Sequence, residues 1–214
     1  IGLFFLWFGW FGFDPGSTLS GTDLRFAVIA VNTNMAAAAG AIAALLVTKF
    51  KTGVWDIGMA INGALAGLVG ITAPCAFVSG GGAIIIGLIA GVIVVFSVYA
   101  LENMGIDDPV GAVSVHGVNG LWGLIAVGLF ADGSYTAWPV TGLFYGGGVD
   151  QLIAQAVGAV TVFAFAFGTG YILFKVMDMV AGIRVSPEEE LTGLDVQEHG
   201  SSAYPNFLTL DDSA

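Results

Sequence analysis

The run between Asp108 and Asp132 contains no Asp, Glu, Lys or Arg, and this limits strongly what the chain can fold into. As an α-helix it is roughly 35 Å long at about 1.5 Å per residue, which is enough to cross a bilayer. Asp108 and Pro109 are predicted to be its N-cap and first residue, because a carboxylate accepts free amide protons and proline has none to offer. One titratable side chain, His116, is therefore placed at membrane depth.

Small residues share the helical face of His116. Ala112 lies one turn before it, and Gly120 and Gly123 lie one and two turns after it. Such a face lets another helix or a narrow channel approach the imidazole. Ionisable residues inside a membrane mark function by default, and the alternative is a hydrogen bond to a neighbouring helix.

The composition indicates an all-α, polytopic membrane helix bundle. The chain is 57% hydrophobic and 10% charged, whereas soluble domains have about 25% charged residues. A net charge of −11 argues against nucleic acid as a partner, because no basic surface could neutralise phosphates. The one cysteine, Cys75, excludes an intramolecular disulfide and a cysteine-rich metal site. We expect neither a metal nor a cofactor.

Six apolar spans and a polar tail are predicted along the chain. The spans cover residues 1–13, about 24–48, 54–78, 81–101, 109–131 and about 149–180. The first is too short to cross a bilayer and opens at Ile1 in the middle of an apolar run, so we expect this chain to be the later part of a longer one. We assign residues 1–181 to a transmembrane domain and residues 182–214 to a tail.

The few cations predict an orientation. Lys49 and Lys51 follow the second span, and Lys175 and Arg184 close the sixth, so alternating crossings put all four on one side. Lys and Arg are in excess on the cytoplasmic side, with Arg25 as the exception here. The tail of this cell-membrane, multi-pass protein is therefore predicted to be cytoplasmic.

Glycine weakens a helix by about 1 kcal/mol per residue in water, but small residues let helices approach closely in lipid. Tight packing is the expected use of most of the 33 glycines. Those predicted to serve it are Gly63, Gly67, Gly70, Gly117, Gly120 and Gly123.

Four motifs stand out in the sequence: WFGWFGFDPGS from Trp7, NGALAGLVGITAPCAFV from Asn62, DDPVGAVSVHGVNGLWG from Asp107 and RVSPEEELTGLDVQEHG from Arg184. Together they resemble the ammonium transporter (Amt/Mep/Rh) family, on its Amt branch. The resemblance implies an eleven-span fold made of two inverted repeats and a last helix, assembled as a homotrimer with one pore per subunit. This chain resembles the second repeat and the last helix.

The resemblance also implies roles for single residues. His116 matches one of two pore histidines, Phe13 matches one of the stacked phenylalanines that close the outer mouth, and Ser17 matches a hydroxyl that helps to recruit ammonium. Trp10 and Thr72 fall in the same motifs and are expected to line the vestibule and pore.

Each of these residues has a structural alternative. Phe13 and Trp10 could belong to the aromatic belt of the membrane interface. Ser17 could form the turn that ends the first span, and Thr72 could bond a carbonyl one turn back. The family usually has Asn at the position of Asp14, so an acid here changes the electrostatics of the mouth.

The implied function is transport of ammonium or ammonia through a hydrophobic pore, with deprotonation of the recruited ion. Aromatic faces hold a cation with about 0.5 to 2 kcal/mol, and a dry pore then disfavours the charged form. The neutral imidazole of His116 could pass a proton or hold ammonia. The alternative is an ammonium sensor that signals through its tail. An enzyme using His116 is disfavoured, because no carboxylate or nucleophile clusters at its depth.

The tail contains a helix-start signal. Ser186 is predicted to be the N-cap, Pro187 the first residue and Glu189 the capping-box partner. A solvated charged tail is one interpretation. The resemblance implies another, in which the tail packs on neighbouring subunits and a nitrogen-regulatory signalling protein binds the cytoplasmic face. The residues expected to be regulatory are Ser186, Glu188, Glu189, Glu190, Gly193, Asp195 and His199.

Overall fold

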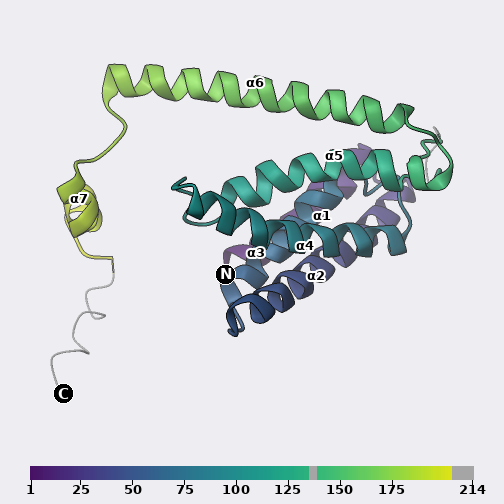
Figure 1. The fold of residues 1–214 in the computed structure, drawn as a ribbon, viewed down its shortest axis with the longest axis horizontal. Helices are drawn as coiled ribbons and strands as arrows, with labels where there is room; N and C mark the ends of the chain where they lie inside the picture. Colours follow the sequence, from purple (N-terminus) through teal and green to yellow (C-terminus); the bar gives the residue numbers. More distant parts are fainter. Residues whose placement is uncertain (135–138, 204–214) are drawn as a thin grey trace. The chain divides into compact units, whose positions relative to one another are not determined.

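The computed structural model describes residues 1–134 and 139–203 of the chain, and these residues are mostly helical (Figure 1). The helices are α1 (Gly2–Phe13), α2 (Arg25–Thr52), α3 (Ile57–Thr72), α4 (Gly80–Asn103), α5 (Asn119–Phe130), α6 (Asp150–Ala181), α7 (Pro187–Thr192) and α8 (Asp195–His199). Short 3-10 turns, η1 (Pro15–Thr18) and η3 (Leu143–Tyr145), and a π-helical turn, η2 (Val113–Val118), complete them. The described ranges hold no β-strand, only an isolated bridge between Asp132 and Thr141, which confirms the all-α class.

The chain divides into two units, residues 1–162 and 163–214. This division falls inside α6, so the predicted boundary between residues 181 and 182 stays a prediction. Residues 204–214 of the predicted tail lie outside the described residues.

In the first unit α2, α3 and α4 lie side by side (Figure 1). Their backbones meet at glycines: a Cβ added to Gly67 of α3 would lie 2.2 Å from the carbonyl oxygen of Ala36 on α2. A Cβ on Gly87 of α4 would lie 2.3 Å from the same oxygen. Because real Cβ atoms never approach so closely, only glycine permits this packing. The packing predicted for Gly67 is therefore observed, whereas Gly117 has no neighbour closer than 3.8 Å.

A buried amide fixes the start of α4 against α2. Asn32 of α2 is 1% exposed, and its Nδ2 donates to the carbonyl oxygens of Cys75 (2.9 Å) and Val78 (2.8 Å). Both carbonyls belong to the connection between α3 and α4. Because they lie outside the two helices, no helical backbone N–H donates to them. One side chain thus satisfies two backbone groups that burial would otherwise leave costly.

Two predicted span ends are wrong. The third span was expected to reach residue 78, but α3 ends at Thr72, because Pro74 has no backbone N–H with which to continue the helical hydrogen bonds. The fifth was expected to begin at Pro109, which instead lies in a turn that ends at Gly111, with φ +70°. The carboxylate of Asp108 still caps the helix, but four residues later than predicted, accepting from the backbone N of Val113 at 3.1 Å.

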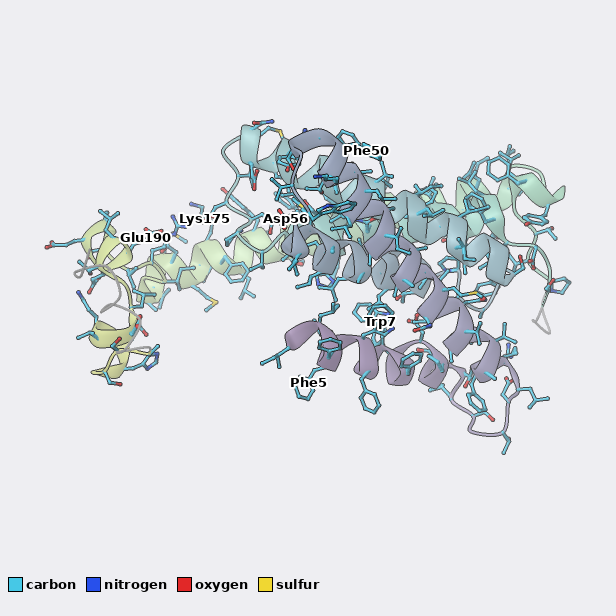
Figure 2. All side chains as sticks on the ribbon, turned by 90° about the horizontal axis from the view of Figure 1, so that it is seen from below. Phe5, Trp7, Phe50, Asp56, Lys175 and Glu190 are labelled. Carbon is cyan, nitrogen blue, oxygen red and sulfur yellow. The ribbon has the colours of Figure 1, made fainter. Side chains whose placement is uncertain are left out.

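Four helical segments in the described residues are long and apolar enough to cross a membrane: α2, α4, the continuous η2–α5 segment and α6. With 16 residues α3 is shorter, and α1 has 12. The count of six spans stays a prediction. Large apolar side chains stand exposed on α1, where Phe5 projects away from the other helices and Trp7 lies on the side facing them (Figure 2).

Candidate functional site

Four of the five predicted pore residues meet where α1 ends. The indole Nε1 of Trp10 donates to Thr72 Oγ1 of α3 at 2.9 Å. The rings of Trp10 and Phe13 are 5.7 Å apart in an edge-to-face arrangement, and Ser17 Oγ donates to the carbonyl oxygen of Phe13 at 2.7 Å. Phe13 is 60% exposed. The arrangement presents an aromatic face and a hydroxyl at one end of the helices.

Asp14 directly follows the aromatic cluster of Trp10 and Phe13, and its backbone N donates to the carbonyl oxygen of Trp10. It is 3% exposed, and Thr33 Oγ1 of α2 donates to its Oδ2 at 2.8 Å. Its other oxygen, Oδ1, is buried without a hydrogen-bond partner among the described residues. An acid thus stands directly beside the hydroxyl and rings predicted to form the mouth.

His116 lies apart from this cluster, on the π-helical turn η2. Its side chain is exposed and makes no hydrogen bond to the described residues. A π turn leaves one carbonyl poorly paired, and here Asn119 Nδ2 donates to the carbonyl oxygen of Ser114 at 2.9 Å. Ser97 Oγ of α4 also donates to Ser114 Oγ at 2.9 Å. These bonds hold the wide turn, which directs the imidazole outward, and π turns of this kind are frequent at functional sites.

The imidazole lines a cleft of about 590 Å³ between α1, α3 and the segment that leads into η2. Leu3 and Leu6 of α1 and Ile61 and Leu65 of α3 form much of its apolar wall. The walls are therefore mostly hydrocarbon, with His116 as the titratable group in the lining.

The cleft and the aromatic cluster lie along one seam between α1 and α3. Leu3, Leu6 and Trp10 are three and four residues apart, so they share a face of α1. Leu65 and Thr72 are seven residues apart, two turns, and so share a face of α3. The seam, which we call the α1–α3 seam, joins Trp10 and Thr72 at one end to the His116 cleft at the other.

Sequence reasoning missed Asn119 and the contact between Asp14 and Thr33. Asn119 is fully buried in a run that was read as a regular helix. Its signal is a side-chain amide three residues after His116, in a stretch where a regular helix gives it no obvious partner. The Asp14–Thr33 bond joins distant parts of the chain and leaves no sequence signal.

The tail helix starts as predicted. Ser186 Oγ accepts from the backbone N of Glu189 at 3.3 Å, and the backbone N of Ser186 donates to Glu189 Oε2 at 2.7 Å. The backbone amide of Ser186 holds the pKa of Glu189 below its usual value. Glu188 and Glu190 lie in the same first turn, where they complement the helix dipole.

The rest of the predicted regulatory segment forms a second short helix. Gly193 ends α7 with φ +90°, a conformation that favours glycine. Asp195 accepts from the backbone N of Ala203 at 3.1 Å, and this bond lowers the pKa of Asp195. His199 closes α8 as an exposed side chain. The local structure of the tail is compact, although its regulatory role stays a prediction.

Comparisons with known proteins show which family this chain matches. The family model described as Ammonium Transporter Family matches residues 1–204. Ammonium transporter Amt2 of Archaeoglobus fulgidus is 55% identical over 213 residues, which are 97% of this chain and 45% of the relative. An ammonium transporter of Bacillus subtilis is 38% identical over 95% of this chain and 50% of its own length. The chain thus spans about half the length of these relatives.

Solved structures agree. A structure titled Sensor Amt Protein matches with a TM-score of 0.82 and 40% identity, over 92% of this chain and 48% of that one. Mep2 of Candida albicans matches with a TM-score of 0.81 and 35% identity, over 88% of this chain and 42% of its own. With a family match over nearly its whole length and a polytopic helical fold shared with these structures, the chain belongs to the ammonium transporter family.

Proposed function

We propose that the complete subunit containing this chain transports ammonium or ammonia across the membrane along the α1–α3 seam. The observation that carries the proposal is that the aromatic cluster and the His116 cleft both lie where α1 faces α3. The exposed ring of Phe13 stands at one end of the α1–α3 seam, and the cleft lined by the imidazole of His116 lies at the other. The relatives named above are ammonium transporters and supply the substrate class.

Capture begins at the aromatic cluster. An exposed ring attracts a small cation through its quadrupole, worth about 0.5 to 2 kcal/mol. The Ser17 hydroxyl donates to a carbonyl, so its oxygen lone pairs face outward and can accept an N–H of ammonium. Neutral solutes gain only the second of these contacts.

Movement along the seam requires loss of the charge. The walls beyond Trp10 are apolar, and transfer of an ion into such surroundings is far costlier than transfer of neutral ammonia. Ammonium therefore gives up a proton before it passes. In the cleft, His116 has no hydrogen bond to the described residues, so its ring can donate to ammonia or accept from it.

Uptake of labelled methylammonium by vesicles holding the complete subunit tests this proposal. His116→Leu removes the polar group with little change in volume, and we expect uptake to fall by roughly tenfold or more, the effect of about 1.4 kcal/mol. His116→Gln keeps a donor and an acceptor and should retain more uptake than His116→Leu. Equal uptake by all three proteins would contradict the role of His116.

A sensor is the second candidate, because one structure similar to this chain is titled Sensor Amt Protein. The same vesicles separate the two functions. Binding of methylammonium without uptake by the unaltered protein would support a sensor. Uptake that saturates with concentration supports transport, which the names of the relatives favour.

The tail and the assembly complete the proposal. We place the tail in the cytoplasm, where Ser186, Glu188, Glu189, Glu190, Gly193, Asp195 and His199 would contact neighbouring subunits of a homotrimer and a nitrogen-regulatory signalling protein. The capping box and the Asp195 bond support a role in such contacts, since they give the tail a defined surface. We assign the chain no enzymatic reaction.

A further inference from the structure

Asp14 is the one buried charged residue in the part of the chain that the structure describes. Its carboxylate receives the Thr33 hydroxyl on Oδ2, while Oδ1 is shielded from solvent and receives nothing within the described residues. The transport steps above do not use it. A buried carboxylate normally has a cation or several donors beside it.

The described residues supply no such cation. Their one ion pair joins Arg25 to Asp23, and both of these side chains are partly exposed at the start of α2. The polar neighbours of Asp14 are the side chains of Thr33, Thr72 and Trp10 and backbone groups at the end of α1, and none of them is a cation. The charge balance at this point is therefore incomplete without a positively charged partner.

The position of Asp14 in the chain brings it to the mouth. Its backbone N donates to the carbonyl oxygen of Trp10 at 2.9 Å, and the backbone N of Ser17 donates to the carbonyl oxygen of Asp14 at 3.1 Å. Asp14 is thus bonded through its main chain to an aromatic residue on one side and to the hydroxyl residue on the other. Phe13 precedes it directly.

We propose that Asp14 is a specificity-determining residue of the mouth, whose carboxylate supplies the negative charge that favours a small monovalent cation there over a neutral amine. This inference rests on the proposed function only for the identity of the cation. The carboxylate acts through space, and no contact with the cation is needed. An amide at this position would keep the hydrogen bond with Thr33 and lose the charge.

The size of the effect follows from Coulomb's law. A unit charge about 8 Å away in surroundings with an effective dielectric constant of about 20 changes cation affinity by roughly thirtyfold. Because the carboxylate is buried, salt should screen this attraction far less than that of a surface acid.

Equilibrium binding of methylammonium to the complete subunit in detergent tests the proposal. We expect Asp14→Asn to weaken binding about thirtyfold, and by nearly the same factor at low and high salt. Asp23→Asn is the matched control, because Asp23 is an acid that lies outside the aromatic cluster and pairs with Arg25. It should change binding little, and any change should vanish at high salt.

A double variant separates charge from structure. Asp14→Asn combined with Thr33→Asp moves the carboxylate to the other end of the same 2.8 Å hydrogen bond. Recovery of binding would support a charge-based role. Unchanged binding in Asp14→Asn, or a folded double variant that does not recover, would overturn it. Because binding is measured, both results hold for a transporter and for a sensor, whereas absent uptake by the unaltered protein would count against transport alone.

Discussion

A few buried polar side chains decide how the apolar helices fit together. In water the hydrophobic effect selects the core, but apolar helices in lipid gain little from hiding apolar surface from one another. Asn32 and Asn119 instead donate to main-chain carbonyls, in the connection between α3 and α4 and in η2. These two side chains therefore fix much of the local backbone geometry.

Replacement of Asn32 tests this view. Asn32→Leu leaves the carbonyls of Cys75 and Val78 without their donor, so we expect a loss of about 2 to 4 kcal/mol in unfolding free energy. Asn34→Leu is the control, since Asn34 lies two residues away on the exposed side of α2. Thermal unfolding in detergent measures both, and equal melting temperatures for the two variants would contradict the role of Asn32.

The residues with special roles were partly predictable from the sequence. His116 stands out because it is an ionisable group in a long uncharged run, and Asn32 is a polar residue inside the predicted second span. Asn119 escaped notice because a regular helix was assumed there, and a π turn depends on a local hydrogen bond that periodicity does not reveal. The buried state of Asp14 depends on Thr33, which is distant in sequence.

At the scale of elements, the interiors of the spans followed from apolar length, whereas their ends did not. Composition sets where a helix can lie in lipid, but the terminal turns depend on individual caps. Pro74 stops α3 early, and Asp108 reaches past a glycine turn to cap η2. The carboxylate of Asp108 can bond across the four intervening residues because the chain turns at Gly111.

The cap on η2 should matter for function. Asp108→Ala removes the acceptor for the backbone N of Val113, so we expect the π turn to fray, with a cost of about 1 kcal/mol and a lower methylammonium uptake. Asp107→Ala is the matched control, because this adjacent acid is exposed and makes no hydrogen bond in the described ranges. Hydrogen exchange at residues 113–118 reports the fraying, and equal exchange in both variants would rule out the cap.

The described residues expose a great deal of apolar surface, and along α6 Ala159 alone is buried. Lipid or further protein must cover such a surface. The sequence predicts which side of the membrane each end occupies only through its five Lys and Arg residues.

Labelling of single cysteines tests the topology of the complete subunit. Ser201→Cys should react with an impermeant maleimide only from the cytoplasmic side, and Ser20→Cys only from outside. Both serines are exposed, and the native Cys75 is 6% exposed, so background labelling in this part of the protein should be low. Labelling of Ser201→Cys in intact cells would reverse the proposed orientation.

The double approach of Gly67 and Gly87 to the carbonyl of Ala36 also bears on motion. The backbones of the helices are in direct contact there, and glycine has no side chain that could change its rotamer. Helices α2, α3 and α4 therefore cannot slide past one another by small steps. They form a stator. Any opening and closing during a transport cycle is then expected in the less tightly packed segments beside this unit, namely α1 and the π-helical turn that carries the imidazole of His116.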